Sequence, residues 1–244
     1  MNFSYNNKTN NLIVIEDGFT FPSMAKKVQY NESEHASYRR RKRSILEPFS
    51  FSVPFFVKNN QNKMGRDEVN RIVNETFYSS GPKKFKLKDS QWYMMGEFNG
   101  PYELPNVINV FNSFEMEFTS SYPYKFYDGE RVQTAGKTVE IATKSQLPTT
   151  PLIELTGLTG TDVQISISSS EFSRIRLTGN LPSNLTIDVE NELIYETGSG
   201  LNRLNLLRID SAFEDFKVKN GDVIVLTNAG ENAKAKLTYK ELML

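Results

Sequence analysis

Residues 108–128 read INVFNSFEMEFTSSYPYKFYD, and this stretch decides the fold. Apolar side chains at positions 114, 116 and 118 alternate with Glu115 and Glu117, which is the period of two expected of a strand with one buried face. Composition changes directly afterwards, because 24 of the 29 aromatic residues lie at or before position 130. The stretch therefore predicts the end of an aromatic-rich β domain and the start of a differently built second domain.

The chain has 244 residues, enough for one large or two modest domains, and the uneven distribution of aromatic residues favours two. Its 29 lysines and arginines balance its 29 aspartates and glutamates, so the overall charge gives no reason to expect nucleic acid or an acidic membrane as a partner. The absence of cysteine excludes disulfides, thiol nucleophiles and cysteine-ligated metal sites. Because the chain has no apolar run of about 18 residues and no secretory signal in its polar amino terminus, we expect a soluble protein that is not exported.

Local patterns in the first 130 residues predict strands around one helix. Apolar residues in alternating or continuous runs predict strands at 12–15, 19–21, 46–57, 85–87, 92–95 and 107–118. Pro48 and Pro54 cannot donate ladder hydrogen bonds, so we expect an edge strand or a bulge within 46–57. A single apolar stripe predicts a helix over about residues 64–79, which Gly81 and Pro82 end. Residues 1–130 are therefore predicted to form a β-sandwich or barrel with one packed α-helix.

The later residues predict a second β domain over 137–244. After a connector that ends at Gly136, short apolar runs between turn residues predict strands at 138–142, 152–155, 163–167, 175–177, 185–189, 193–195, 205–209, 223–226 and 233–239. Between two of these strands, Asn191 suits the left-handed backbone of a tight turn, with Glu190 and Glu192 beside it. Short strands at this spacing are typical of a β-sandwich.

Residues 24–43 are polar and cannot bury much surface by themselves. A loop or an extended arm that packs on something else is the economical interpretation. The segment ends in five consecutive cations, which allow three interpretations: nucleic-acid binding through counterion release, pairing with carboxylates, or a solvated loop. On a strand, alternate members would face opposite sides, so at most three could line one surface. The five cations are Arg39, Arg40, Arg41, Lys42 and Arg43.

Other candidate sites carry weaker patterns. His35 is the sole histidine and has no second ligand at a recognisable spacing, so we expect a loop histidine. Asp188 with Glu190, and Glu214 with Asp215, have the residue types of a glycosidase acid and nucleophile, but 29 acidic residues make some proximity inevitable. Calcium-type loops and phosphate-binding glycine loops are missing from the sequence. We therefore predict no enzymatic activity, no metal site and no cofactor.

A carbohydrate-binding adhesion module that acts through the second domain is the alternative function. Sugar sites usually present an aromatic platform, but the second domain has no tryptophan and few aromatic residues. Trp92 lies in a predicted strand of the first domain, where a core position is expected. The composition therefore weakens this alternative without removing it.

The order of elements and four local motifs resemble the distal tail proteins of siphophages that infect Gram-positive bacteria. Residues 86–93 (KLKDSQWY) are similar to that family's strand, acidic turn and aromatic strand, and 114–118 (FEMEF) with 122–126 (YPYKF) to the end of its first domain. Residues 185–195 and 213–226 resemble a hairpin and a closing strand pair of its second domain. Two loop positions depart from the family pattern, Tyr122 before Pro123 and Asp222 after Gly221.

The resemblance implies a structural tail protein without enzymatic activity. It implies a hexameric hub that connects the tail tube to the tip or baseplate and to host-recognition components, in the tail of a virion assembled in the host cytoplasm. The first domain would form the ring around the tail channel, and a galectin-like second domain would project outward. Implied partners are further copies of this chain, the tail tube protein, a tail-tip protein and, as further candidates, receptor-binding proteins.

The resemblance also gives the polar segment a role. A comparable region of the family is an arm that engages the neighbouring subunit, which implies that residues 24–43 lie against the next copy. The five cations would then pair with carboxylates of that copy or face the DNA channel. Candidate carboxylates are Glu32, Glu34, Glu115 and Glu117.

Overall fold

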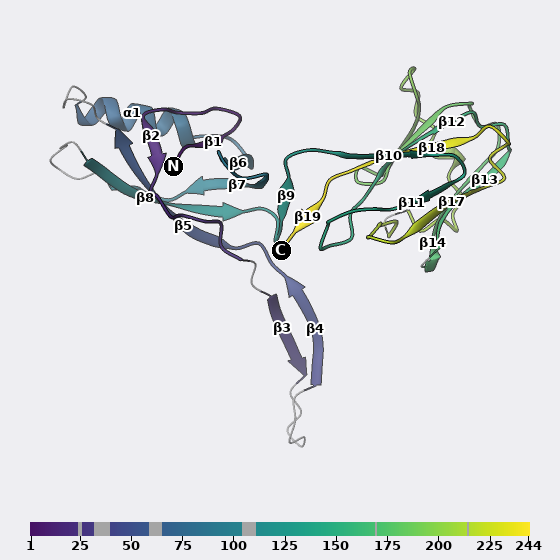
Figure 1. The fold of residues 1–244 in the computed structure, drawn as a ribbon, viewed down its shortest axis with the longest axis horizontal. Helices are drawn as coiled ribbons and strands as arrows, with labels where there is room; N and C mark the ends of the chain where they lie inside the picture. Colours follow the sequence, from purple (N-terminus) through teal and green to yellow (C-terminus); the bar gives the residue numbers. More distant parts are fainter. Residues whose placement is uncertain (24–25, 32–39, 59–64, 104–110, 169, 214) are drawn as a thin grey trace. The chain divides into compact units, whose positions relative to one another are not determined.

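A computed structural model describes residues 1–23, 26–31, 40–58, 65–103, 111–168, 170–213 and 215–244. The chain is mainly β, and it divides into two compact units, Met1–Asp128 and Gly129–Met243 (Figure 1). The described residues contain one α-helix. The predicted fold class, mainly β with two domains, is confirmed.

The first unit is built on one antiparallel sheet that nearly closes on itself. Its strands follow the order β1-β6-β7-β8-β5-β2, and β9 pairs with the beginning of β7. The Ile15 N–H donates to the Met1 carbonyl at 2.9 Å and so links the two outermost strands of this order. The bounds are β1 (Phe3–Tyr5), β2 (Ile13–Ile15), β5 (Ser50–Lys58), β6 (Lys83–Leu87), β7 (Trp92–Asn99), β8 (Phe111–Ser120) and β9 (Lys125–Tyr127).

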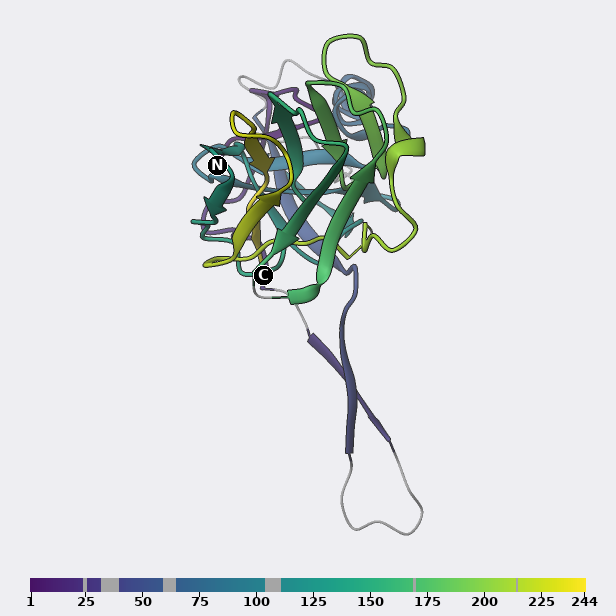
Figure 2. The ribbon, with the colours of Figure 1, turned by 90° about the vertical axis from the view of Figure 1, so that its right-hand side faces the viewer.

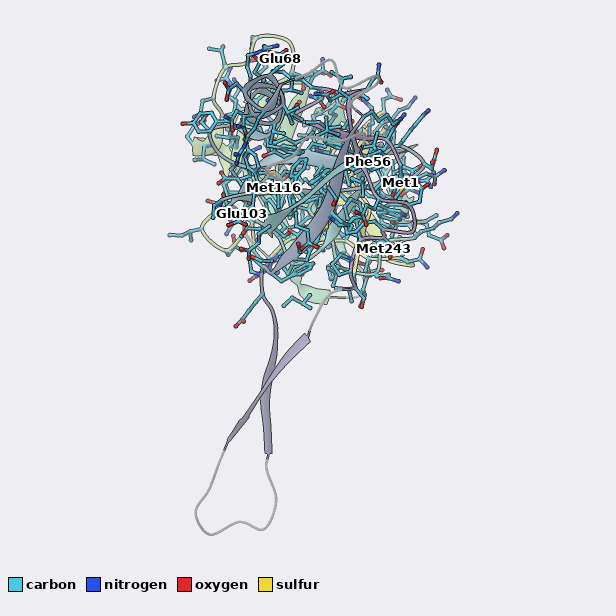
Figure 3. All side chains as sticks on the ribbon, turned by 90° about the vertical axis from the view of Figure 1, so that its left-hand side faces the viewer. Met1, Phe56, Glu68, Glu103, Met116 and Met243 are labelled. Carbon is cyan, nitrogen blue, oxygen red and sulfur yellow. The ribbon has the colours of Figure 1, made fainter. Side chains whose placement is uncertain are left out.

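Helix α1 (Arg66–Phe77) packs its apolar stripe on the concave face of this sheet. The Phe77 ring lies 4.8 Å from the rings of both Phe55 and Phe98, measured between centroids. On the solvent face Arg71 pairs with Glu68 at 2.7 Å, and Figure 3 labels Glu68 on the helix. The helix lies within the predicted range and ends four residues before Gly81. Together the sheet and the helix enclose an aromatic core.

Gly96 lies on β7 directly against the backbone of β8. A Cβ at this position would lie 2.2 Å from the carbonyl oxygen of Thr119 and 2.7 Å from the ring of Phe118. Real Cβ atoms do not approach backbone oxygens so closely, so only glycine fits here.

Strand β5 differs from its prediction, because it is not an edge strand. It pairs with β8 along its whole length and with β2 over Phe55–Val57. The Pro54 carbonyl accepts the N–H of Glu16 at 3.1 Å, so its ring nitrogen faces the same side, where β2 has already ended at Ile15. The missing donor therefore costs no ladder bond, and a proline is tolerated within the sheet. The strand predicted at 19–21 is also wrong, because these residues form no strand.

The second unit is a sandwich of two antiparallel sheets. One has the order β10-β18-β12-β15-β16 and the other β11-β17-β13-β14. Their inward residues form one aliphatic cluster, in which Ile153 lies between Ile187 and Leu237, and Ile165 between Ile175 and Leu226. The bounds are β10 (Arg131–Ala135), β11 (Thr138–Glu140), β12 (Leu152–Thr156), β13 (Asp162–Ile167), β14 (Ser170–Thr178), β15 (Leu185–Asp188), β16 (Leu193–Glu196), β17 (Val223–Thr227), β18 (Lys234–Tyr239) and β19 (Leu242–Met243).

Three local predictions for the second unit are corrected. The strand predicted at 205–209 is replaced by a short 3-10 helix, η2 (Leu204–Leu206). The predicted connector up to Gly136 contains strand β10. In the turn between β15 and β16, the left-handed residue is Glu192, with φ 57°, rather than Asn191. Asn191 instead donates its backbone N–H to Asp188 at 3.0 Å and its side-chain amide to the same carboxylate at 2.8 Å.

Candidate functional site

The segment predicted as a loop or arm contains a β-hairpin. Strands β3 (Lys26–Asn31) and β4 (Arg40–Leu46) are antiparallel and form a two-stranded sheet of their own, drawn as a twisted ribbon in Figure 2. Neither strand pairs with another described strand. Two-stranded sheets are marginally stable in water and offer unpaired N–H and C=O groups along both edges. The described part of the chain therefore leaves both outer edges of this hairpin without a neighbouring strand.

Four of the five predicted cations fall on β4, and Arg39 lies outside the described residues. The pairing places Arg43 opposite Gln29 and Arg41 opposite Tyr30, so Lys42 is the extra residue of a β-bulge. The strict alternation expected along the run is interrupted at this residue. The two strands together carry six cations and no carboxylate in their sequence, namely Lys26, Lys27, Arg40, Arg41, Lys42 and Arg43.

A group of carboxylates occupies the outer face of the first unit's sheet. Glu115 and Glu117 are exposed on β8, and Glu97 is half-buried on β7 beside Thr119, which shares their face. Glu115 accepts a hydrogen bond from the Ser52 hydroxyl at 2.7 Å. None of the three carboxylates pairs with a cation whose side chain the structure describes. We call Glu97, Glu115 and Glu117 the acidic face.

Two lysines of the first unit's sheet, on the neighbouring strand β6, are engaged elsewhere. Lys84 and Lys86, both on β6, bind the two oxygens of Asp128, the last residue of the first unit. Hydrogen bonds from Lys84 and Lys86 lower the pKa of the Asp128 carboxyl, against the opposing effect of partial burial. The Lys84 ammonium also lies 4.5 Å from the centre of the Tyr93 ring. The acidic face is therefore left without these two cations.

Glu241 is a buried carboxylate of the second unit. Burial raises its pKa, but the backbone N–H of Lys144, the guanidinium of Arg131 and the Thr143 hydroxyl outweigh burial and lower the pKa overall. The Lys144 N–H lies 2.9 Å from Glu241 Oε1. Glu241 thus joins β10 to the loop after β11, and its bonds are those of a structural carboxylate.

The remaining sequence candidates are dispersed. His35, Glu32, Glu34 and Glu214 lie outside the described residues, which also leaves the pair of Glu214 with Asp215 without geometry. The Asp188 carboxylate holds the turn through Asn191, and Glu190 is exposed. Trp92 is half-buried and packs edge-on against Tyr127, with 5.4 Å between ring centroids.

In the described ranges, no three histidines, aspartates or glutamates are grouped as a metal ion would require. No helix there combines the length and apolar character needed to cross a membrane. The described residues instead present two surfaces of opposite charge, the basic hairpin and the acidic face. The sequence predicted the cations of β4 and the two glutamates of β8, but not Glu97 or the pairing of β3 with β4.

The whole chain has the fold of a known phage protein. It is similar to SPP1 Dit, described as a paradigm of the hub of the adsorption apparatus in phages that infect Gram-positive bacteria. The TM-score is 0.81 at 11% sequence identity, over 100% of this chain and 99% of that chain. No protein-family model matches the sequence, and no curated protein matches it either.

Two structures of the phage P2 baseplate in its activated conformation also contain a similar chain. The structure with Ca gives a TM-score of 0.52 at 8% identity, and the structure with Sr gives 0.50 at 9%, each over 97% of both chains. At these identities the likeness shows the fold, and it includes both units in the same order along the chain.

Proposed function

We propose that this chain is a structural protein of a phage tail, which forms the hub between the tail tube and the tip or baseplate. The observation that carries the proposal is the match of the whole chain to SPP1 Dit, at a TM-score of 0.81. Fold alone does not fix function, so the hairpin and the acidic face are the second support. In this proposal the chain has no enzymatic activity and resides in the virion tail.

Six copies form a closed ring through one repeated contact in this proposal. A ring requires a heterologous interface, where one surface of a subunit meets a different surface of the next. The basic hairpin and the acidic face fulfil this requirement, because they are distinct and of opposite sign. Addition of the hairpin to a neighbouring sheet edge would also satisfy its free backbone groups. The tail tube protein, a tail-tip protein and receptor-binding proteins are the proposed partners of the ring.

Electron microscopy with mass measurement of the purified full chain tests ring formation directly. We expect ring-shaped particles of about six times the 27.9 kDa chain mass, with one copy in each sector. A monomer at every concentration, with no ring in assembled particles, would count against the hub.

A charge exchange tests which surfaces meet. The double variant Glu115→Lys/Glu117→Lys places cations opposite the cationic hairpin, so the ring should dissociate, and high salt should weaken this effect. Adding Arg40→Glu and Arg43→Glu, which pair with Asn31 and Gln29 and so share one face of the hairpin, should restore the ring. Glu231→Lys, at an exposed position of the second unit, is the matched control and should leave the ring intact. Rings that persist in the Glu115→Lys/Glu117→Lys variant would place the contact elsewhere.

A further inference from the structure

The second unit contains an open hollow of about 540 Å³ whose surroundings are not used by the proposed ring contact. It lies between the loop after β14, the end of β16 and η2. The volume is within the range of about 300–1,000 Å³ that small-molecule sites occupy.

Backbone hydrogen bonds hold the walls of this hollow in place. The Gly179 N–H donates to the Thr161 carbonyl at 3.0 Å, and the Arg203 N–H to the Ile194 carbonyl at 2.7 Å. The Glu196 N–H donates to the Leu201 carbonyl at 2.9 Å. The hollow is therefore preformed, and a ligand would not have to order a loop before it binds.

The charges that line the hollow cancel. Arg203 and Glu196 are its only charged lining residues, and they form an ion pair of 2.9 Å between Nη2 and Oε2. A phosphate or carboxylate ligand would compete with Glu196 for the guanidinium. The electrostatics therefore favour a neutral ligand.

Hydrogen-bond donors and acceptors are both available to such a ligand. The Arg203 side chain is 36% exposed and donates to Glu196 from Nη2, so its guanidinium keeps further N–H donors. The side chains of Asn180 and Asn205 are exposed at the rim, and within the described residues neither is used in a hydrogen bond. Each amide offers a donor and an acceptor. A ligand with several hydroxyl groups matches this set, because each hydroxyl can donate to one group and accept from another.

The rest of the lining consists of Thr178, Gly179 and three aliphatic side chains. Leu181, Pro182 and Leu206 contribute apolar surface, which suits the C–H faces of a sugar ring, and no aromatic side chain takes part. Without an aromatic platform, a single site should bind weakly, with a Kd of about 1 mM.

We propose that this hollow binds a neutral saccharide, held by Arg203, Glu196 and the amides of Asn180 and Asn205. This site is independent of ring formation, and its aliphatic wall replaces the aromatic platform that the sequence lacks. If several copies assemble as proposed above, weak sites would act together on a polymer that carries many sugars.

Saturation-transfer difference NMR on the full chain tests the site with glucose, galactose, N-acetylglucosamine and rhamnose, each compared with glycerol phosphate. At least one neutral sugar should give a signal, and glycerol phosphate should not compete with it. In Asn180→Ala/Asn205→Ala the affinity should fall about tenfold, since two hydrogen bonds are lost. Asn232→Ala, at an exposed asparagine outside the hollow, is the matched control and should bind as the unaltered chain does.

Arg203→Lys provides a second, independent test. Lysine keeps the charge beside Glu196 but lacks the planar set of N–H donors of the guanidinium, so the sugar affinity should fall while the circular dichroism spectrum stays unchanged. Silence of all four sugars, a response to glycerol phosphate alone, or full binding by Asn180→Ala/Asn205→Ala would each overturn the proposal. Ring formation is read separately by microscopy, so failure of the saccharide site and failure of the hub remain distinguishable.

Discussion

The two units fill their cores with different side chains, although their strands share the same alternation of buried and exposed residues. The first unit buries aromatic rings from both the sheet and the helix. The centroid of the Phe55 ring, for example, lies within 5.5 Å of the ring centroids of Phe3, Phe77, Phe98 and Phe114. The second unit buries mostly isoleucine, leucine and valine. A single curled sheet needs long side chains to reach across its interior, whereas two sheets about 10 Å apart interdigitate with branched aliphatic ones. The two units therefore share the alternation of buried and exposed residues, and the size of their core side chains distinguishes the curled sheet from the sandwich.

Replacing Phe55 with alanine should break the first core. Phe55 is fully buried, so the variant loses its transfer free energy, leaves a cavity and removes four ring contacts. We expect a loss of about 3–5 kcal/mol in the free energy of unfolding. Because Trp92 is the only tryptophan and lies in the first unit, its fluorescence during urea unfolding reports this loss.

The matched change in the second core is Ile165→Val, which removes one methylene group from a fully buried position. It should cost about 0.5–1.5 kcal/mol and leave the tryptophan transition of the first unit in place. If Ile165→Val shifted that transition as well, the two cores would not unfold separately.

The next largest effect is expected from Gly96→Ala. The added methyl group would meet the Thr119 backbone, so β7 and β8 must separate locally. We expect a loss of about 1–3 kcal/mol in thermal or urea unfolding. Gly136→Ala is the control, because a Cβ there meets no atom within 4 Å. An unchanged transition in Gly96→Ala would show that the contact between β7 and β8 is looser than the structure indicates.

The alternation of apolar residues and the composition are sufficient to predict those helices and strands whose pattern of burial follows from their own residues. The stripe of α1 and the alternation around Glu115 and Glu117 follow from residues that face one core. The change in aromatic content near residue 130 reflects the two kinds of core. The acidic residues of β8 were identified from sequence for the same reason, since exposure alternates with burial along one strand.

The missed features depend on distant residues. Pro54 was predicted at an edge or bulge because sequence does not show that β2 ends opposite it. The sequences of β3 and β4 contain six cations and few apolar residues, so they carry no clear period-two signal. Arg203 and Asn205 come from a segment predicted in part as a strand, and the hollow forms only when η2 meets the loop after β14. No local pattern could have indicated either site.

A smaller effect is expected from Asp128→Asn, which removes a carboxylate at the end of the first unit. The variant keeps the shape but loses two charge-assisted bonds to lysines, so at pH 7 it should be less stable by about 1 kcal/mol. Because the pKa of Asp128 is lowered in the folded chain, its stabilisation is present above the unfolded pKa of about 3.9 and is lost as pH falls through the folded pKa.

Urea unfolding of both chains across pH gives the measurement. The stability difference should be constant near neutral pH and should shrink from about pH 5 towards about pH 2. Glu241 is present in both chains, so its own titration cancels in the difference. A difference that persisted in strong acid would assign the effect to packing rather than to charge.

The smallest expected effect is a gain in stability from Glu192→Gly in the second unit. Glu192 adopts φ 57°, a left-handed backbone that side chains other than glycine adopt at a cost of about 1–2 kcal/mol. Glycine removes this cost but gives the unfolded chain more freedom, so the net gain should be about 0.5 kcal/mol.

Glu190→Gly is the control, because the same turn has no positive φ there and only the entropic loss remains. Hydrogen exchange of the β15 and β16 amides measures both variants. Since Asp188 and Asn191 hold the turn in each, protection should rise in Glu192→Gly and fall in Glu190→Gly, whereas a fall in both would mean that the turn tolerates Glu192 without strain.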